Sequence, residues 1–165
     1  MACFQYLSLV CCIIFLHAAG VKSECHLGWN HFEDSCYMFS KDALNWYLAE
    51  SSCRGHGARL AEVTTKAQSD YLISMVKILN NGNEYWLGGR DDIIEGTWQW
   101  ASTDKVFTYT AWGPTNPSNN GGDEDCLQLR DFGSVGIKWN DISCQVGIKF
   151  ICEKQLDSDS SEIIG

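Results

Sequence analysis

Apolar residues recur at helical spacing in two stretches of this chain and alternate with polar residues in several others. The first stretch predicts a helix from about Trp46 to Gly55, with Asn45 as its N-cap. The second begins at a capping box formed by Thr65 and Gln68 and ends at residues 80–83, where Asn and Gly tolerate left-handed backbone. Five residues of this second helix are predicted to face the core: Tyr71, Leu72, Met75, Val76 and Leu79.

The rest of the chain has the short, alternating patterns of strands and turns. Trp98, Trp100 and Phe107 alternate with polar residues, as in half-buried strands. Three further segments predict strands: two short strands with a turn within residues 24–44, one at 85–88 and a closing strand at 148–152.

Between Ala111 and Trp139 the composition predicts a loop of nearly thirty residues, because Gly, Asn, Asp, Pro and Ser prevail there. Long loops in compact domains are usually functional or disordered. Cys126 and Cys144 bracket side chains that carry oxygen donors, which favours order imposed by a ligand.

Both ends of the chain differ from its centre. An apolar run from Leu7 to Leu16 is followed by small residues, which is typical of a secretory signal peptide at 1–23, cleaved after Gly20 or Ser23. The run is too short to span a bilayer. We expect a secreted, extracellular domain at 24–154 and an acidic, disordered tail at 155–165.

Nine cysteines occur, and six of them follow the predicted signal peptide. An even number in a secreted chain implies disulfides, but spacing does not choose among the 15 possible pairings. Zinc is a poor alternative, because no Cys-x-x-Cys pair exists and the histidines lack ligand spacing with the cysteines.

Charge excludes one class of partner. Without residues 1–23 the chain has 11 basic and 21 acidic residues, a net charge of −10. With no basic stripe, a nucleic-acid partner is not expected. Acidity suits cation binding, but it more often serves solubility.

The sequence predicts no enzyme. It contains neither Gly-x-Ser-x-Gly nor His-Glu-x-x-His, and the six cysteines are expected in disulfides, which leaves no thiol nucleophile. Glu124 and Asp141 could mimic the carboxylate pair of a glycosidase, but a calcium site would use both.

Six motifs, in this order, resemble the C-type lectin domain family from about Cys25 to Glu153. They are Arg59-Leu60-Ala61-Glu62, Tyr85-Trp86-Leu87-Gly88-Gly89, Glu95-Gly96-Thr97-Trp98-Gln99-Trp100, Glu124-Asp125-Cys126, Trp139-Asn140-Asp141 and Phe150-Ile151-Cys152-Glu153. Within the family, the run around Asn116-Pro117-Ser118 resembles secreted invertebrate members such as perlucin-like proteins.

The resemblance implies the fold and its cross-links. The expected C-type lectin fold is α+β, with two helices beside two small antiparallel sheets and a long calcium-ordered loop. The implied disulfides are Cys25–Cys36, Cys53–Cys152 and Cys126–Cys144.

The resemblance also implies a calcium site on the loop, built around a cis bond before Pro117. The implied calcium ligands, which would also bind the carbohydrate, are Asn116, Ser118, Glu124, Asn140 and Asp141. Asp141 could add its backbone carbonyl. Calcium prefers such oxygen ligands.

This chain departs from the family pattern at the proline motif. Sugar-binding members usually carry Glu-Pro-Asn or Gln-Pro-Asp, each with one carboxylate, whereas Asn116-Pro117-Ser118 has none. Two carboxylates instead of three predict weaker calcium binding, and the sugar cannot be named.

An accessory calcium site is implied at four further positions: Asp91, Glu95, Asn119 and Asp125. The alternative is that Asp91, Asp92 and Glu95 form a solvated turn.

Three functions follow from these patterns. The first is a secreted calcium-dependent lectin that binds glycans. The second is a perlucin-like matrix protein that binds calcium carbonate mineral, and the third is a protein-binding module without sugar binding. No heptad or collagen-like segment occurs, so any oligomer must form through the domain surface.

Overall fold

The structure, a computed structural model, describes residues 24–79 and 84–156. The predicted signal peptide, the predicted end of the second helix at 80–83 and residues 157–165 of the predicted tail lie outside the described residues. Within the described part, no helix has the length and apolarity needed to cross a membrane.

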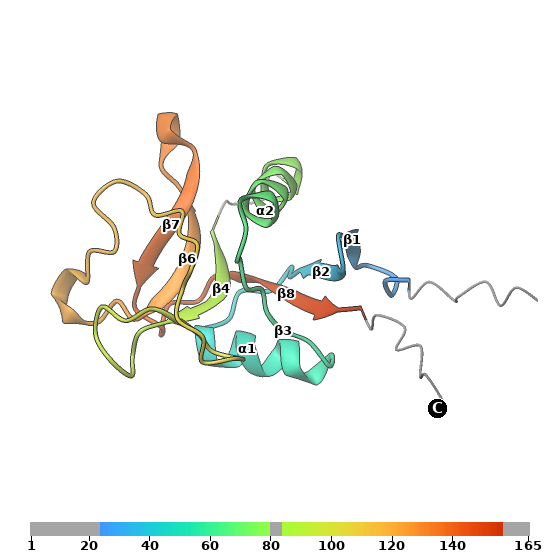
Figure 1. Cartoon of the computed structure of the whole chain (residues 1–165), viewed down its shortest axis with the longest axis horizontal. Helices are drawn as coiled ribbons and strands as arrows, with labels where there is room; N and C mark the ends of the chain where they lie inside the picture. The colour runs from blue at the N-terminus through green and yellow to red at the C-terminus, as the bar shows by residue number, and fades with distance from the viewer. Residues whose placement is uncertain (1–23, 80–83, 157–165) are drawn as a thin grey trace, which may run out of the picture.

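Strands of the described chain form a mixed sheet in the spatial order β1-β2-β8-β4-β6-β7, with β3 beside β8 and β5 beside β4 (Figure 1). The expected antiparallel groups, around β8 and around β4, are joined by the parallel pairing of β4 with β8. The strand bounds are Asn30–Phe32 (β1), Ser35–Phe39 (β2), Arg59–Leu60 (β3), Tyr85–Arg90 (β4), Gln99–Trp100 (β5), Cys126–Asp131 (β6), Ile137–Ile142 (β7) and Lys149–Gln155 (β8).

Both predicted helices are confirmed. Helix α1 spans Trp46–Gly55, and the Asn45 side chain accepts a hydrogen bond from the Leu48 amide at 2.9 Å. Helix α2 spans Lys66–Leu79. Thr65 and Gln68 form the predicted capping box, with each side chain 3.2 Å from the other's backbone amide.

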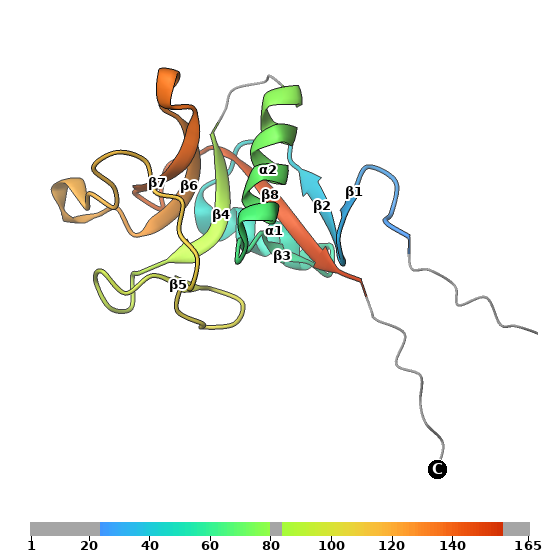
Figure 2. The same ribbon diagram turned by 45° about the horizontal axis from the view of Figure 1, so that its top comes forward.

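The two-residue period of β4 and β8 explains how the helices are arranged. Tyr85, Leu87 and Ile151 face the cluster that contains Leu72 and Val76 of α2. The intervening residues face the cluster that contains Trp46, Ala49 and Cys53 of α1, and they are Trp86, Phe150 and Cys152. The two helices therefore cover opposite faces of the central strands (Figure 2).

The prediction of a loop from 111 to 139 is wrong in its second half. Strands β6 and β7 form an antiparallel hairpin there, with Leu129 opposite Trp139. Leu127, Leu129 and Ile137 alternate into the core, so the two-residue hydrophobic period outweighed the polar composition. The long irregular loop is the segment before Cys126, which contains a 3₁₀ turn at Asn120–Gly122. The short connection between β6 and β7 contains a second 3₁₀ turn, at Gly133–Val135.

Two smaller boundaries also differ from prediction. The closing strand β8 starts at Lys149 and continues to Gln155, which pairs with Ser35, so the predicted tail at 155–165 begins inside a strand. Within the segment where Trp98, Trp100 and Phe107 alternate with polar residues, the structure has a strand at Gln99–Trp100 alone.

Gly89 explains why small residues follow Trp86 and Leu87 in β4. A Cβ at Gly89 would lie 2.8 Å from Leu127 Cδ2 and 2.5 Å from Phe107 Cζ. Glycine therefore allows the aromatic ring and β6 to pack directly on the strand.

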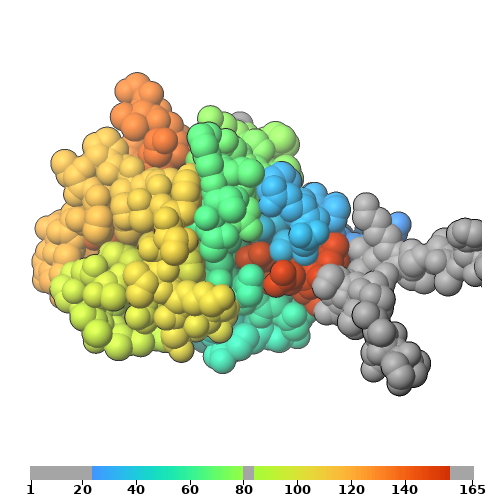
Figure 3. All heavy atoms as spheres, viewed as in Figure 1, coloured from blue at the N-terminus to red at the C-terminus, as the bar shows by residue number. Residues whose placement is uncertain are grey.

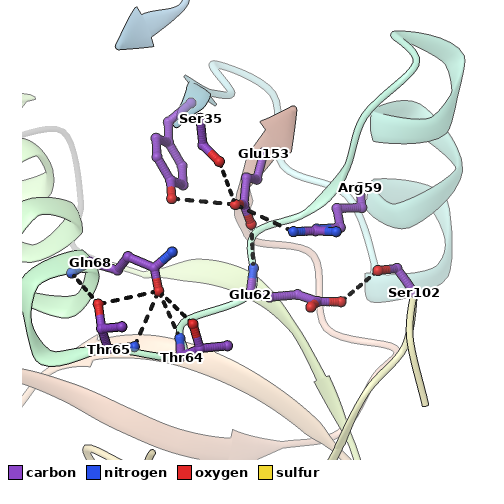
Figure 4. A network of polar contacts seen from close by, with 9 residues as sticks. Ser35, Arg59, Glu62, Thr64, Thr65, Gln68, Ser102 and Glu153 are labelled. Atoms are coloured by element: carbon purple, nitrogen blue, oxygen red, sulfur yellow. Dashed lines mark hydrogen bonds and ion pairs between the residues drawn. The ribbon is translucent and has the colours of Figure 1, made fainter. Parts of the chain in front are cut away.

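A buried polar network ties the sheet together around Glu153, which is 3% exposed (Figure 4). Its carboxylate accepts hydrogen bonds from Ser35 Oγ at 2.9 Å, from Tyr37 Oη at 3.4 Å and from the Glu62 amide at 3.0 Å. Arg59 adds an ion pair at 3.4 Å. Burial of the Tyr37 hydroxyl raises its pKa, and the negative charge of Glu153 raises this pKa further. The hydroxyl therefore stays protonated and donates its hydrogen bond to Glu153.

The three implied disulfides are confirmed: Cys25–Cys36, Cys53–Cys152 and Cys126–Cys144. Cys126–Cys144 closes the open end of the β6–β7 hairpin beside the loop. The loop and the turn between β4 and β5 lie together at one end of the molecule, and the two ends of the described chain lie at the other (Figure 3).

Candidate functional site

The Asn116–Pro117 peptide bond is cis, as the sequence predicted. The segment around it packs on β7 because Gly113 donates its amide to the Trp139 carbonyl at 2.8 Å, and the Trp139 amide donates to the Ala111 carbonyl at 2.9 Å. These bonds bring the proline motif beside Asn140 and Asp141, more than twenty residues later in the chain.

Asp141 organises the loop next to the proline. The Ser118 and Asn119 amides both donate to its Oδ2, each at 2.6 Å. The residue is 1% exposed, and its Oδ1 is buried with no hydrogen-bond partner in the described chain. A buried carboxylate oxygen without a donor usually requires a cation, a water molecule or another explanation.

Glu124 closes the other side of the cluster. Its Oε2 accepts from Ser118 Oγ at 2.8 Å and from the Asn120 amide at 2.7 Å. Asn119 has a left-handed backbone with φ of 42°, and its side-chain oxygen accepts from the Glu124 amide at 3.4 Å. The 3₁₀ turn thus directs Glu124 back toward the proline motif.

Two amides connect the proline motif to β7. Asn116 Nδ2 donates to Asn140 Oδ1 at 2.9 Å, and Asn140 Nδ2 donates to the Asp141 carbonyl at 2.6 Å. The structure therefore links all five predicted ligands in one hydrogen-bonded cluster: Asn116, Ser118, Glu124, Asn140 and Asp141.

The donor set of this cluster suits a hard cation such as calcium, which takes carboxylate, amide, hydroxyl and carbonyl oxygens. The cluster has only two carboxylates. In the part of the chain that the structure describes, no group of three or more His, Cys, Asp or Glu side chains is placed to hold a metal ion. Any coordination shell here would combine the two carboxylates with neutral amide, hydroxyl and carbonyl oxygens.

Asp91, the first residue of the predicted accessory site, is 4% exposed. Its Oδ2 accepts from the Gly96 amide at 2.9 Å, while its Oδ1 is buried with no hydrogen-bond partner among the described residues. Burial raises the pKa of Asp91 to about 6, and the charges of Glu95, Asp125 and Asp141 add to the rise. Repulsion among these carboxylates means that a cation would stabilise their charged forms.

The other accessory positions are more open. The Asp91 amide donates to the Asp125 carbonyl at 3.1 Å, which joins the two segments. Burial and then the charge of Glu95 raise the pKa of Asp125. Asp92 and Glu95 are exposed, so the turn is solvated except at Asp91.

Aromatic residues pack beneath the loop. Trp139 is fully buried, and the half-buried Trp112 meets its edge with ring centroids 5.6 Å apart. The ring centroids of Trp98 and Trp112 lie 4.9 Å apart. Trp112 and Trp139 therefore support the loop from the core side.

Sequence patterns missed two residues beside the site. Gln128 is fully buried opposite Asn140, and neither atom of its side-chain amide has a partner in the described structure. Phe132 covers Gly113, where a Cβ would lie 2.7 Å from the ring. The Gly113 contact could not be found from the sequence, because it joins segments that only the folded sheet brings together.

Comparison with known proteins identifies relatives over most of the chain. A family model, the lectin C-type domain, matches residues 42–154. Perlucin from Haliotis laevigata is 38% identical over 132 residues, which cover 79% of this chain and 83% of perlucin. The crystal structure of the C-type lectin CEL-I from Cucumaria echinata superimposes with a TM-score of 0.74 at 25% identity, covering 82% of this chain and 100% of CEL-I.

Some relatives are longer. C-type lectin domain family 4 member E from Mus musculus is 33% identical over 138 residues, which cover 82% of this chain but 63% of that protein. The chain therefore spans less than two thirds of this relative.

Proposed function

This chain belongs to the C-type lectin family, and from that membership we propose that it is a secreted, calcium-dependent carbohydrate-binding protein. The observation that carries the proposal is the convergence of five oxygen-bearing side chains beside the cis-proline, with one buried oxygen of Asp141 left without a donor. Calcium, when bound there, supplies coordination positions that sugar hydroxyl oxygens can fill.

The protein's own residues would hold both ligands. Glu124 and Asp141 provide the negative charge, and Asn116, Ser118 and Asn140 provide neutral oxygens. The amide and hydroxyl groups also donate hydrogen bonds, so they can position a sugar whose adjacent hydroxyls accept them. Trp112 and Trp139 pack beneath the cluster and hold it in place.

A glycan array with and without chelator tests this proposal. We expect glycan binding in calcium, loss of that binding with chelator, and loss in Glu124→Gln, which removes one of the two carboxylates. Calcium titration calorimetry should show an affinity reduced by roughly tenfold or more in this variant.

The matched control is Glu33→Gln, which removes a charge on the exposed turn between β1 and β2. Its glycan and calcium binding should equal those of the unmodified protein. Glycan retention that persists in chelator would rule out the calcium-dependent mechanism.

A second candidate is a matrix protein that binds calcium carbonate mineral. The similarity to perlucin and the excess of carboxylates favour it. The purified protein should then adsorb to calcium carbonate crystals and alter their growth; absence of both effects would remove this candidate.

A further inference from the structure

Gln128, in the middle of β6, carries a buried amide that the described fold does not use. Its side chain is fully buried, and neither its Nε2 nor its Oε1 has a hydrogen-bond partner among the described residues. Burying an amide without hydrogen bonds destabilises a protein. The same face of the sheet carries Trp86 and Cys126, so an apolar side chain would suit the fold better. A residue that breaks a packing rule in this way points to a functional role.

Cross-strand pairing places Gln128 beside the candidate site. β6 lies between β4 and β7 (Figure 1), and Gln128 is opposite Trp86 on one side and opposite Asn140 on the other. Side chains directly opposite each other in an antiparallel pair share a face, with Cβ atoms about 4.5–5.5 Å apart. The Trp86 indole already donates to the Leu44 carbonyl at 2.9 Å. Asn140 is therefore the cross-strand neighbour to which the Gln128 amide can bond.

The orientation of the Asn140 amide does not yet suit a cation. Its Nδ2 donates to the Asp141 carbonyl at 2.6 Å, and its Oδ1 accepts from Asn116 Nδ2 at 2.9 Å. A cation shared by Asn140 Oδ1 and the Asp141 carbonyl needs both oxygens directed toward it, whereas here the donor group of Asn140 faces that carbonyl. Turning the Asn140 amide breaks the hydrogen bond to Asp141, so Nδ2 then needs another acceptor.

We propose that Gln128 is a positioning residue, whose Oε1 accepts a hydrogen bond from Asn140 Nδ2 when Asn140 Oδ1 is directed at a cation. This inference rests on the proposed calcium-dependent function. Gln128 Oε1 is a buried acceptor on the correct face, and the second N–H of Asn140 Nδ2 stays available for a sugar hydroxyl. Groups behind metal ligands fix the orientation of those ligands in the same way. Gln128 thus lowers the stability of the ion-free protein and raises its affinity for calcium.

Gln128→Met tests this role, because methionine has a similar length and no amide. We expect calcium titration calorimetry to give an affinity about tenfold lower than that of the unmodified protein. In chelator, urea denaturation should give an unfolding free energy equal to or higher than that of the unmodified protein, because the variant removes an unpaired buried amide. A lower unfolding free energy would assign Gln128 a structural role and overturn the proposal.

A double-mutant cycle shows whether the effect passes through Asn140. Asn140→Ala removes the amide that Gln128 is proposed to orient. Adding Gln128→Met to Asn140→Ala should therefore leave the calcium affinity close to that of Asn140→Ala alone. A further tenfold loss in the double variant would show that Gln128 acts on the ion by another route, and the proposal would fail.

Leu129→Met is the matched control. Leu129 follows Gln128 but packs on the other side of β6, in the cluster that contains Leu127, and its variant should keep the calcium affinity of the unmodified protein. If the unmodified protein binds calcium and Gln128→Met binds it equally well, or Leu129→Met loses as much affinity, the inference is overturned while the proposed function stands. If the unmodified protein binds no calcium, the proposed function fails, and the role assigned to Gln128 fails with it.

Discussion

Asn116 and Ser118 together carry the chemical difference between this loop and the sugar-binding pattern of its family, because that pattern has a carboxylate at one of the two positions and this chain has none. The Ser118 hydroxyl donates to Glu124 at 2.8 Å, so the residue uses a carboxylate of the cluster instead of adding one. Because calcium affinity follows the number of charged ligands, we expect a carboxylate at position 118 to strengthen any binding of the ion by this loop.

Ser118→Asp should therefore raise calcium affinity by roughly tenfold. The added carboxylate would lie next to Glu124, and their mutual repulsion favours a cation between them. Titration calorimetry measures the effect, with Ser118→Asn as the control of similar size and no charge. Equal affinities for the two variants would show that charge at this position does not limit binding.

Among the elements, β2, β3 and β8 depend on one buried carboxylate. Glu153 on β8 accepts from Ser35 and Tyr37 of β2 and pairs with Arg59 of β3. The predicted motif around Phe150 to Glu153 thus ends in a group that holds three strands in register.

Glu153→Ala should lower the free energy of unfolding by about 3–5 kcal/mol, because it leaves the partly buried Arg59 without its partner. Urea denaturation measures this loss. The control, Glu84→Ala, removes an exposed carboxylate 3.8 Å from Arg130 and should change stability by about 0–1 kcal/mol. A small loss of unfolding free energy in Glu153→Ala would mean that water replaces the carboxylate as the partner of Arg59 and of the Ser35 and Tyr37 hydroxyls.

At the scale of the whole molecule, the loop and the ends of the described chain lie at opposite poles (Figures 1 and 2). The helices and the disulfide between α1 and β8 stabilise the pole with the chain ends. At the loop pole the Cys126–Cys144 disulfide and the Trp112–Trp139 packing lie beside polar contacts of Glu124 and Asp141. Because these polar contacts belong to the candidate site, ligand binding there should be visible in global stability.

Free calcium at a hundred times its dissociation constant should add about 2.7 kcal/mol to the free energy of unfolding. A thermal melt should then show a higher Tm in calcium than in chelator, and little change with magnesium, which prefers a stricter octahedral shell. Glu124→Gln should lose most of the rise. A rise of the same size in this variant would place the stabilising ion elsewhere.

Much of the fold was predictable because its information is local. Helical spacing and the residues Asn45, Thr65 and Gln68 defined both helix starts, since a cap is a contact between residues three apart. The loop prediction failed where it relied on polar composition, because the alternation of Leu127, Leu129 and Ile137 was the stronger signal.

The sequence by itself determined the helices, the family and the set of oxygen-bearing side chains, because periodicity and motif order are properties of neighbouring residues. Only the tertiary structure decided which of these side chains meet. Asn116 reaches Asn140 and Ser118 reaches Asp141 through loop packing on β7, and Asp91 is buried while Asp92 is exposed. Burial and long-range contacts depend on how the sheet packs, so no local pattern encodes them.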